Sequence, residues 1–433
     1  MRRRLAMIIR RAPPRTGRRL RRLRETCHRL MRAPAVRALL LENVHPDAAT
    51  ILEAAGAEVE TIDRALDHRA LVAALAGVQL LGIRSKTEVT EAVFDEAPDL
   101  LAIGAFCIGT NQVDLGAARE RGVAVFNAPF SNTRSVVELA LAEIIALTRR
   151  LTPKNTAMHA GVWDKSAEAA HEVRGRRLGI VGYGNIGAQL SVLAEALGMS
   201  VYFYDTADKL ALGNARRCAS LDDLLAVADV VTLHVDGRAG NSGMFGAEQF
   251  ARMRPGSLFL NLSRGFVVDH GALRTQVESG RLAGAAIDVF PHEPAGRGDE
   301  FRSELRDLPN VILTPHIAGS TEEAQQDIGR YVAGKLRDYQ LDGGTAMSVN
   351  LPHLSLPPRP GGRRIAHLHR NVPGVLAKIN SLLAEHKVNI DGQLLDTRGE
   401  YGYVLTDIAV DYPAAVLGSL AAMPETVRVR LLG

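Results

Sequence analysis

A glycine-rich turn between an apolar strand and a helix constrains this chain more than any other feature of its sequence. The turn reads Gly-Tyr-Gly-Asn-Ile-Gly over residues 182–187 and follows the apolar segment RLGIV. Gly182 permits the tight turn, Gly184 lets the backbone approach a pyrophosphate, and Gly187 allows close packing of the helix. The helix N-terminus then attracts phosphate charge. The segment therefore predicts the first strand, turn and helix of a parallel sheet that binds a dinucleotide.

A carboxylate eighteen residues past this turn indicates which dinucleotide binds. Asp205 ends the predicted strand VYFYD, where a carboxylate accepts hydrogen bonds from ribose hydroxyls and repels a 2′-phosphate. We therefore expect NAD rather than NADP as the cofactor. The alternative is a structural glycine turn followed by an unrelated aspartate.

Strands alternate with helices on both sides of the turn, which is typical of parallel sheets covered on both faces. We predict an α/β fold with two doubly wound parallel-sheet domains. A Rossmann-type nucleotide domain takes residues 131–319, and a flavodoxin-like substrate domain takes residues 36–130 and 320–350. A linker rich in Pro and Gly, LPHLSLPPRPGGRR, then leads to residues 363–433, whose order β-α-β-β-α-β is the ferredoxin-like motif.

The formal net charge of +4 comes from one end of the chain. Residues 1–32 hold 13 of the 52 basic residues but one of the 48 acidic residues, so the rest of the chain is acidic and we expect no nucleic-acid partner. We predict residues 1–35 to be a disordered basic extension, because their arginine side chains repel one another and the segment offers little apolar area for burial. A start codon misplaced upstream of Met31 and an organelle transit peptide are the alternatives.

The remaining composition is that of a globular protein in a reducing compartment. No run of eighteen apolar residues offers a membrane span, so we expect no membrane partner. Cys27, Cys107 and Cys218 lack metal-binding spacing and cannot all pair with one another. We therefore expect a cytoplasmic protein without a metal site.

Three polar residues follow three of the predicted strands of the nucleotide domain: Arg264 in NLSRG, Glu293 in DVFPHEP and His316 in LTPHIAG. Because the carboxyl ends of parallel strands meet at one crevice, we expect these side chains to converge beside the nicotinamide. Oxidation of a secondary alcohol needs a base, and imidazole titrates near working pH. A carboxylate can raise the pKa of that imidazole, and a guanidinium can bind a substrate carboxylate with two hydrogen bonds. Each residue taken alone has a structural alternative.

These segments carry a resemblance to a known family. TPHIAGST, NLSRG, AAIDVF, the glycine turn and FNAPFSNTRSVVELA resemble the D-isomer-specific 2-hydroxyacid dehydrogenases, in their bacterial branch acting on 3-phosphoglycerate, from Val36 to Gly433. The resemblance implies oxidation of 3-phosphoglycerate to 3-phosphohydroxypyruvate, the first step of L-serine biosynthesis, with reduction of 2-oxoglutarate as a side activity, by a homotetramer. A dehydrogenase for glyoxylate or a branched oxo acid, or a non-enzymatic NAD-sensing protein, are the alternatives.

The same resemblance assigns roles to individual residues. It makes Arg264, Glu293 and His316 the catalytic set. It places the following residues against NAD: Gly182, Gly184, Asn185, Ile186, Gly187, Asp205, Leu262, Ser263, Asp288, Ile317, Ala318 and Gly319. It places the following residues against the substrate: Arg84, Ser85, Lys86, Asn132, Trp163 and Lys165.

Some of these positions have a physical rationale or depart from the family pattern. Two cations and a hydroxyl in GIRSKT form a plausible phosphate site, although a solvated strand end is the alternative. Lys86 stands where the branch commonly has arginine, and Ala318 stands where TPHIGG motifs have glycine. The resemblance makes Trp163 insert into a neighbouring subunit, with Lys165 near the active site of that subunit.

The C-terminal segment resembles an ACT domain, with HRNVPGVL as its recognisable loop and helix start. The resemblance implies L-serine as a feedback inhibitor that binds His369, Asn371 and, from an adjacent domain, Asn389. Arg370 and Val372 depart from the charge pattern of serine-inhibited members. A structural dimerisation domain and a different ligand are the alternatives.

Overall fold

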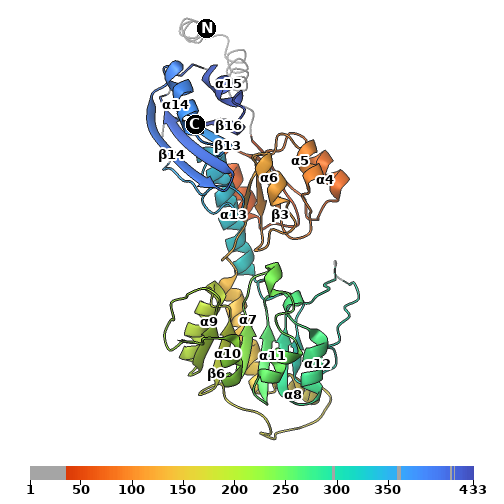
Figure 1. The fold of residues 1–433 in the computed structure, drawn as a ribbon. Coiled ribbons are helices and arrows are strands. Elements are labelled where there is room, and N and C mark those ends of the chain that lie inside the picture. The colour runs from red at the N-terminus through yellow and green to blue at the C-terminus, as the bar shows by residue number, and fades with distance from the viewer. Residues whose placement is uncertain (1–35, 295–297, 358–361, 410–411, 414) are drawn as a thin grey trace, which may run out of the picture. The chain divides into compact units, whose positions relative to one another are not determined.

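The computed structural model describes residues 36–294, 298–357, 362–409, 412–413 and 415–433. The predicted basic extension lies outside the described residues. The chain divides into two compact units: unit 1 runs to Asn127 and resumes at Val332, and unit 2 spans Ala128–Tyr331 (Figure 1). The C-terminal sheet is thus grouped with the first sheet, and the domain boundaries expected from the sequence stay predictions.

The first sheet of unit 1 has five parallel strands in the order β2-β1-β3-β4-β5. This flavodoxin-like order confirms the predicted fold. The strands are β1 (Arg37–Leu40), β2 (Glu58–Thr61), β3 (Leu80–Ile83), β4 (Ala102–Ala105) and β5 (Ala124–Phe126). The helices are α3 (Asp47–Ala54), α4 (His68–Ala74), α5 (Glu91–Glu96) and α6 (Leu115–Glu120). Every residue of β3 and β4 is buried, as their unbroken apolar sequences predict.

Unit 2 contains a seven-stranded sheet in the order β12-β11-β10-β9-β6-β7-β8, with all paired strands parallel. This is the predicted Rossmann-type order with a further strand at one edge. The strands are β6 (Arg177–Val181), β7 (Ser200–Tyr204), β8 (Arg216–Arg217), β9 (Val230–Leu233), β10 (Ser257–Asn261), β11 (Leu282–Ile287) and β12 (Val311–Leu313).

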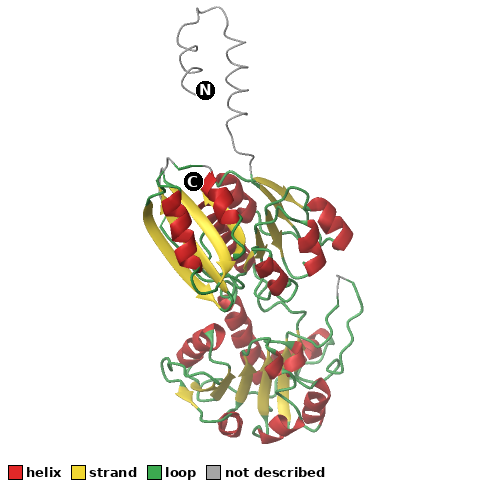
Figure 2. Ribbon diagram, turned by 45° about the horizontal axis from the view of Figure 1, so that its top comes forward, coloured by secondary structure: helices red, strands yellow, loops and turns green. Residues whose placement is uncertain are grey.

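Helices lie on both sides of this sheet (Figure 2). They are α7 (Thr133–Thr148), α8 (Leu151–His159), α9 (Asn185–Ala196), α10 (Leu221–Val227), α11 (Ala247–Arg252) and α12 (His270–Glu278). Buried residues of α7 and α9 share one apolar cluster with strands of the sheet, and buried residues of α10, α11 and α12 share another. The two clusters cover the two faces and make the sheet a rigid base for the loops at its strand ends.

The third sheet is antiparallel, in the order β14-β15-β13-β16. It consists of β13 (Arg363–Arg370), β14 (Ile390–Arg398), β15 (Tyr401–Ile408) and β16 (Thr426–Leu432), with α14 (Val375–Glu385) and α15 (Ala415–Ala421) packed against it. The chain order β-α-β-β-α-β confirms the predicted ferredoxin-like motif. A long helix, α13 (Glu322–Asp342), precedes this sheet.

The third sheet is tied to the rest of unit 1 by side chains that bond to backbone carbonyls. Tyr403 donates its hydroxyl to the carbonyl of Gly343 at 2.7 Å, and Arg428 Nη1 donates to the carbonyl of Leu100 at 2.6 Å. These buried contacts hold the C-terminal sheet against the first sheet and the end of α13.

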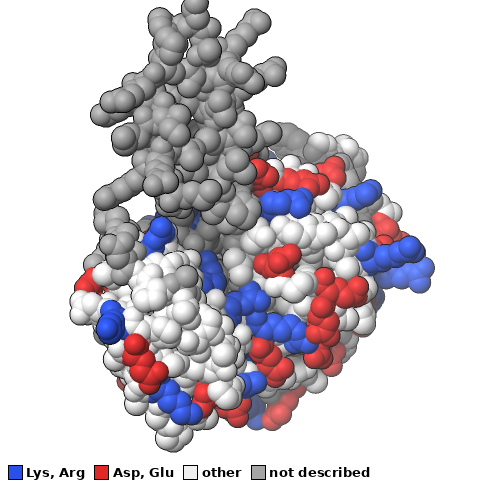
Figure 3. Space-filling model, turned by 90° about the horizontal axis from the view of Figure 1, so that it is seen from above, with Lys and Arg blue, Asp and Glu red and all other residues white. Residues whose placement is uncertain are grey.

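Two general properties of the described residues concern the charge of the surface and the character of the helices. Basic and acidic side chains alternate in small groups over the face drawn in Figure 3. No helix of the described part of the chain combines the length and the apolar character needed to cross a bilayer.

Candidate active site

The predicted glycine turn connects β6 to α9. Gly182 has a φ of 93°, and a Cβ there would lie 2.6 Å from the carbonyl oxygen of His234, so only glycine fits. A Cβ at Gly187 would lie 2.4 Å from the carbonyl oxygen of Gly182, which explains the close packing of α9 on the turn. A Cβ at Gly184 would meet no described atom within 4 Å, and no described side chain caps the helix that starts after it. The turn therefore presents open backbone and uncapped amides, which fits the pyrophosphate of a dinucleotide.

Asp205, directly after β7, contacts the glycine turn through its carboxylate. Its Oδ2 accepts from the amide of Tyr183 at 2.8 Å, and its Oδ1 accepts from the amide of Ala207 at 2.8 Å. The carboxylate is half-buried beside the glycine turn, where a ribose would follow the pyrophosphate. The residues present therefore fit NAD.

His316 and Glu293 form a hydrogen-bonded pair, as the sequence predicts. Nδ1 of His316 lies 2.8 Å from Oε2 and 3.0 Å from Oε1 of Glu293. The hydrogen bond to Glu293 is the main reason that the pKa of His316 is raised above its ordinary value, against the opposing effect of burial. Burial would raise the pKa of Glu293, but hydrogen bonds from His316 and from the Phe290 amide outweigh it and lower that pKa. The pair therefore favours a carboxylate beside a readily protonated imidazole.

Arg264 is the third residue predicted for this site. It follows β10 at the start of a short 3-10 helix, and its Nη1 donates to the carbonyl of Ser263 at 2.7 Å. Its positive charge contributes to lowering the pKa of both His316 and Glu293. All three residues thus follow neighbouring strands of the unit 2 sheet, His316 and Glu293 are hydrogen-bonded, and the charge of Arg264 acts on both.

Asp288 has a structural role that the sequence does not reveal. It is fully buried after β11, where Oδ1 accepts from Thr314 Oγ1 at 2.6 Å and from the Ile317 amide at 2.8 Å. Oδ2 accepts from the Ala318 amide at 2.9 Å, and the backbone carbonyl accepts from the His316 amide. His316 itself has a φ of 52°, a left-handed conformation unusual for a residue with a Cβ. Asp288 therefore anchors the strained segment that carries the imidazole.

The other residues predicted to contact the cofactor differ in how far their side chains are exposed. Leu262, Ser263 and Ala318 are buried, whereas Ile317 is 43% exposed beside His316. Gly319 packs against Asn132, since a Cβ there would lie 2.1 Å from Asn132 Nδ2. Asn132 therefore lies beside Gly319 in unit 2.

The predicted phosphate residues lie in unit 1, directly after β3. Arg84 is half-buried, and Ser85 and Lys86 are exposed. The side chains of Glu42 and Gln112 form hydrogen bonds with the backbone of this segment.

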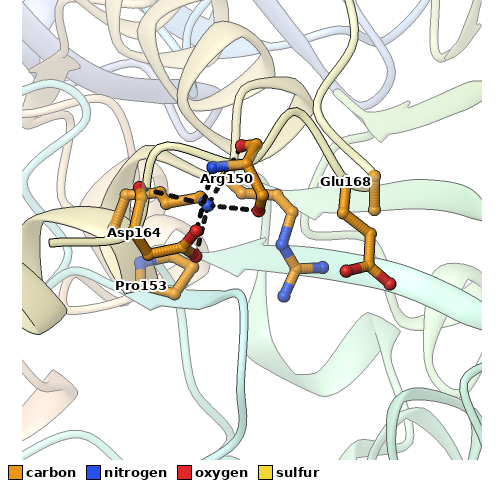
Figure 4. Close-up of a pocket in the computed structure, with 7 residues that line it drawn as sticks. Arg150, Pro153, Asp164 and Glu168 are labelled. Atoms are coloured by element: carbon orange, nitrogen blue, oxygen red, sulfur yellow. Dashed lines mark hydrogen bonds and ion pairs between the residues drawn. The ribbon is translucent and has the colours of Figure 1, made fainter. Parts of the chain in front are cut away.

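Trp163 and Lys165 lie in the segment after α8, and the Trp163 side chain is 77% exposed. Lys154 of α8 holds this segment: its Nζ donates to Asp164 Oδ2 at 2.5 Å and to Ser166 Oγ at 3.1 Å. The hydrogen bond from Lys154 is the main cause that lowers the pKa of Asp164 to about 2. A charged pocket beside this network is lined by Arg150, Pro153, Lys154, Asp164, Ser166, Glu168 and Ala169 (Figure 4). The large apolar side chain of Trp163 is therefore presented to solvent by an ordered polar loop.

The predicted effector residues differ in accessibility. His369 is fully buried on β13, where Nδ1 donates to the carbonyl of Arg370 at 2.9 Å and the ring packs against Gly402. Asn371 and Asn389 are exposed. Asn371 Nδ2 donates to the carbonyl of Gly399 at 3.3 Å, and Asn389 Nδ2 donates to Asp391 Oδ1 at 2.9 Å. In this conformation the two amides, rather than the imidazole, are open to a ligand.

Comparison with known proteins matches both parts of this architecture. A family model described as the NAD binding domain of D-isomer specific 2-hydroxyacid dehydrogenases matches residues 141–318, and an AHAS small subunit-like ACT domain matches residues 365–428. Among solved structures, D-2-hydroxyisocaproate dehydrogenase is 25% identical with a TM-score of 0.67, covering 73% of this chain and 100% of that one. A protein of Thermus thermophilus is 30% identical with a TM-score of 0.63, covering 70% and 96% of the two chains.

Curated relatives match almost from end to end. The D-3-phosphoglycerate dehydrogenase of Escherichia coli is 51% identical over 400 residues, and that of Haemophilus influenzae is 48% identical over 398 residues. Each match covers 92% of this chain and 97% of the relative. The chain therefore belongs to the D-isomer specific 2-hydroxyacid dehydrogenases, and within them to the D-3-phosphoglycerate dehydrogenase family. It is an NAD-dependent oxidoreductase.

Proposed function

We propose that this chain oxidises 3-phosphoglycerate to 3-phosphohydroxypyruvate with NAD, the first step of L-serine biosynthesis. The observation that carries the proposal is the His316–Glu293 pair beside Arg264, on a segment anchored by Asp288. The relatives named D-3-phosphoglycerate dehydrogenase support the choice of substrate.

The tautomer of His316 follows from its partner. A carboxylate only accepts, so Nδ1 carries the proton that it donates to Glu293, and Nε2 has the lone pair. Nε2 therefore takes the proton of the substrate hydroxyl, and Glu293 stabilises the resulting imidazolium. Arg264 binds the substrate carboxylate and fixes the orientation of the carbon that is oxidised. NAD, when bound, accepts the hydride from that carbon.

The substrate phosphate is assigned to Arg84, Ser85 and Lys86. Two cations and a hydroxyl at one strand end match a dianionic group. Trp163 and Lys165, presented on the ordered loop after α8, are assigned to a contact with a second subunit. The homotetramer, the cytoplasmic location and the 2-oxoglutarate side activity stay predictions from the resemblance.

A steady-state assay of NADH formation tests the proposal. We expect turnover of 3-phosphoglycerate and far weaker turnover of D-glycerate, which lacks the phosphate. His316→Ala should lower kcat by about 10²–10⁴-fold and leave NAD affinity unchanged. Arg84→Ala should raise KM for 3-phosphoglycerate but leave the slow turnover of D-glycerate unchanged. Equal turnover of both substrates by the unaltered chain would instead identify another 2-hydroxyacid dehydrogenase.

Feedback inhibition by L-serine is the regulatory part of the proposal. The ACT match and the exposed amides of Asn371 and Asn389 support it, since amides can hold both the carboxylate and the hydroxyl of an amino acid. We expect added L-serine to lower NADH formation, and Asn371→Ala to abolish that response without changing the uninhibited rate. An unaltered chain that ignores L-serine would leave the third sheet as a structural or differently liganded domain.

A further inference from the structure

The loop after β3 has its backbone amides occupied by one buried side chain. Glu42, two residues after β1, is 8% exposed. Its Oε2 accepts from the amides of Ser85 at 3.1 Å and Lys86 at 3.0 Å, and its Oε1 accepts from the amide of Thr87 at 2.8 Å. Three successive amides that converge on one point form the kind of nest that binds an anion. Here the anion is supplied by the chain itself.

The carbonyl at the start of the same loop is held from the other side. Gln112 Nε2 donates to the carbonyl of Arg84 at 2.5 Å, and the Cys107 thiol lies 3.4 Å from that oxygen. Both residues follow β4, the neighbouring strand of the sheet. The carbonyl of Arg84 and the next three amides are thus all bonded to side chains of the protein.

The backbone at Glu42 is itself in an unfavourable conformation. Glu42 has a φ of 62° and Asn43 a φ of 55°, so two successive residues with a Cβ lie in the left-handed region. Such residues persist where the surrounding structure demands them, and they cluster at functional sites. Here the unusual turn directs the Glu42 carboxylate beneath the loop.

We propose that Glu42 is a positioning residue for the anionic group of the substrate. Its carboxylate fills the nest formed by the backbone amides of residues 85–87, so the anionic group of the substrate is bound by the side chains of Arg84, Ser85 and Lys86 and not by those amides. This inference rests on the proposed function in one respect, which is that the bound group is the phosphate of 3-phosphoglycerate. A loop whose backbone is already satisfied keeps the guanidinium and the ammonium in place before the substrate arrives.

Glu42→Gln tests this assignment, because an amide of the same shape lacks one acceptor oxygen and the negative charge. Glu60→Gln, the same change at an exposed position of neighbouring β2, is the matched control. In the holoenzyme, hydrogen–deuterium exchange of the amides of residues 85–87 should accelerate in Glu42→Gln but not in the control. KM for 3-phosphoglycerate should rise about tenfold, as expected for loss of a hydrogen bond to a charged group, while KM for NAD and kcat change less than twofold.

A double variant separates positioning from general destabilisation. With Arg84→Ala already present, Glu42→Gln should raise KM by no more than about twofold, because the guanidinium, the main charged group that Glu42 positions, is gone. Unchanged exchange and unchanged KM in Glu42→Gln would overturn the proposal, as would a full further tenfold rise in the double variant. If Glu42→Gln does not fold, Gln112→Leu frees the Arg84 carbonyl and should raise the same KM. An unaltered chain that does not oxidise 3-phosphoglycerate would refute the proposed function, whereas the exchange measurement would still judge the role of Glu42.

Discussion

Glu143 is a buried carboxyl on α7, and replacing it with glutamine should stabilise the protein increasingly as the pH rises. The residue is 4% exposed, and neither carboxylate oxygen has a hydrogen-bond partner among the described residues. Burial, with a smaller contribution from the charge of Asp288, raises the pKa of Glu143 from 4.5 to about 8. The folded protein therefore holds a proton at neutral pH that the unfolded chain releases.

The magnitude follows from proton linkage. Between the two pKa values the folded state binds one more proton than the unfolded state, so the free energy of unfolding falls as the pH rises. Each pH unit in this range contributes about 1.4 kcal/mol. Between about pH 4.5 and pH 7, the free energy of unfolding of the wild-type protein therefore falls by about 3 kcal/mol relative to that of a chain in which residue 143 does not titrate. This decrease levels off above about pH 8. Glutamine at position 143 does not titrate, so the free energy of unfolding of Glu143→Gln should rise relative to that of the wild type by the same amount over this pH range.

Urea unfolding followed by circular dichroism, at several pH values between about 5.5 and about 8, measures this difference. Glu138→Gln is the control on the same helix, because Glu138 is exposed and paired with Arg134 at 2.6 Å. That variant should differ from wild type by about 0.5 kcal/mol or less at every pH. A Glu143→Gln curve that runs parallel to wild type would refute the reasoning, because it would mean that Glu143 is ionised in the folded state.

Two further predictions concern the active site. Glu293→Gln removes the charged hydrogen-bond partner that raises the pKa of His316. Because oxidation needs the neutral imidazole, the rise of kcat/KM with pH should then move to lower pH. We also expect kcat to fall about 10²-fold. A pH–rate profile with its limb in the same place would contradict the pairing. Asp205→Ser removes the carboxylate that accepts from the Tyr183 amide and should raise the NADP to NAD ratio of kcat/KM about tenfold or more, as steady-state assays with each cofactor measure. An unchanged ratio would count against a ribose-binding role.

Much of the fold could be predicted from the sequence because its signals are local. The unbroken apolar runs of β3 and β4 identify buried parallel strands, and the glycine turn marks where the first strand of the nucleotide-binding sheet leads into its helix. By contrast, β2 and β8 lie at sheet edges and are largely or wholly exposed. Strands with so few buried residues have no hydrophobic pattern to recognise.

The convergence of Arg264, Glu293 and His316 could also be predicted, because parallel strands end at one edge of a sheet whatever their separation in sequence. Only the tertiary structure decided which polar side chains stabilise the backbone around that site. Asp288 bonds to the backbone around His316, Glu42 accepts hydrogen bonds from the amides after β3, and Glu143 is buried on α7. The reason is physical: a carboxylate takes its role from the donors and the solvent that surround it, and here those donors come from segments up to 45 residues away in the chain.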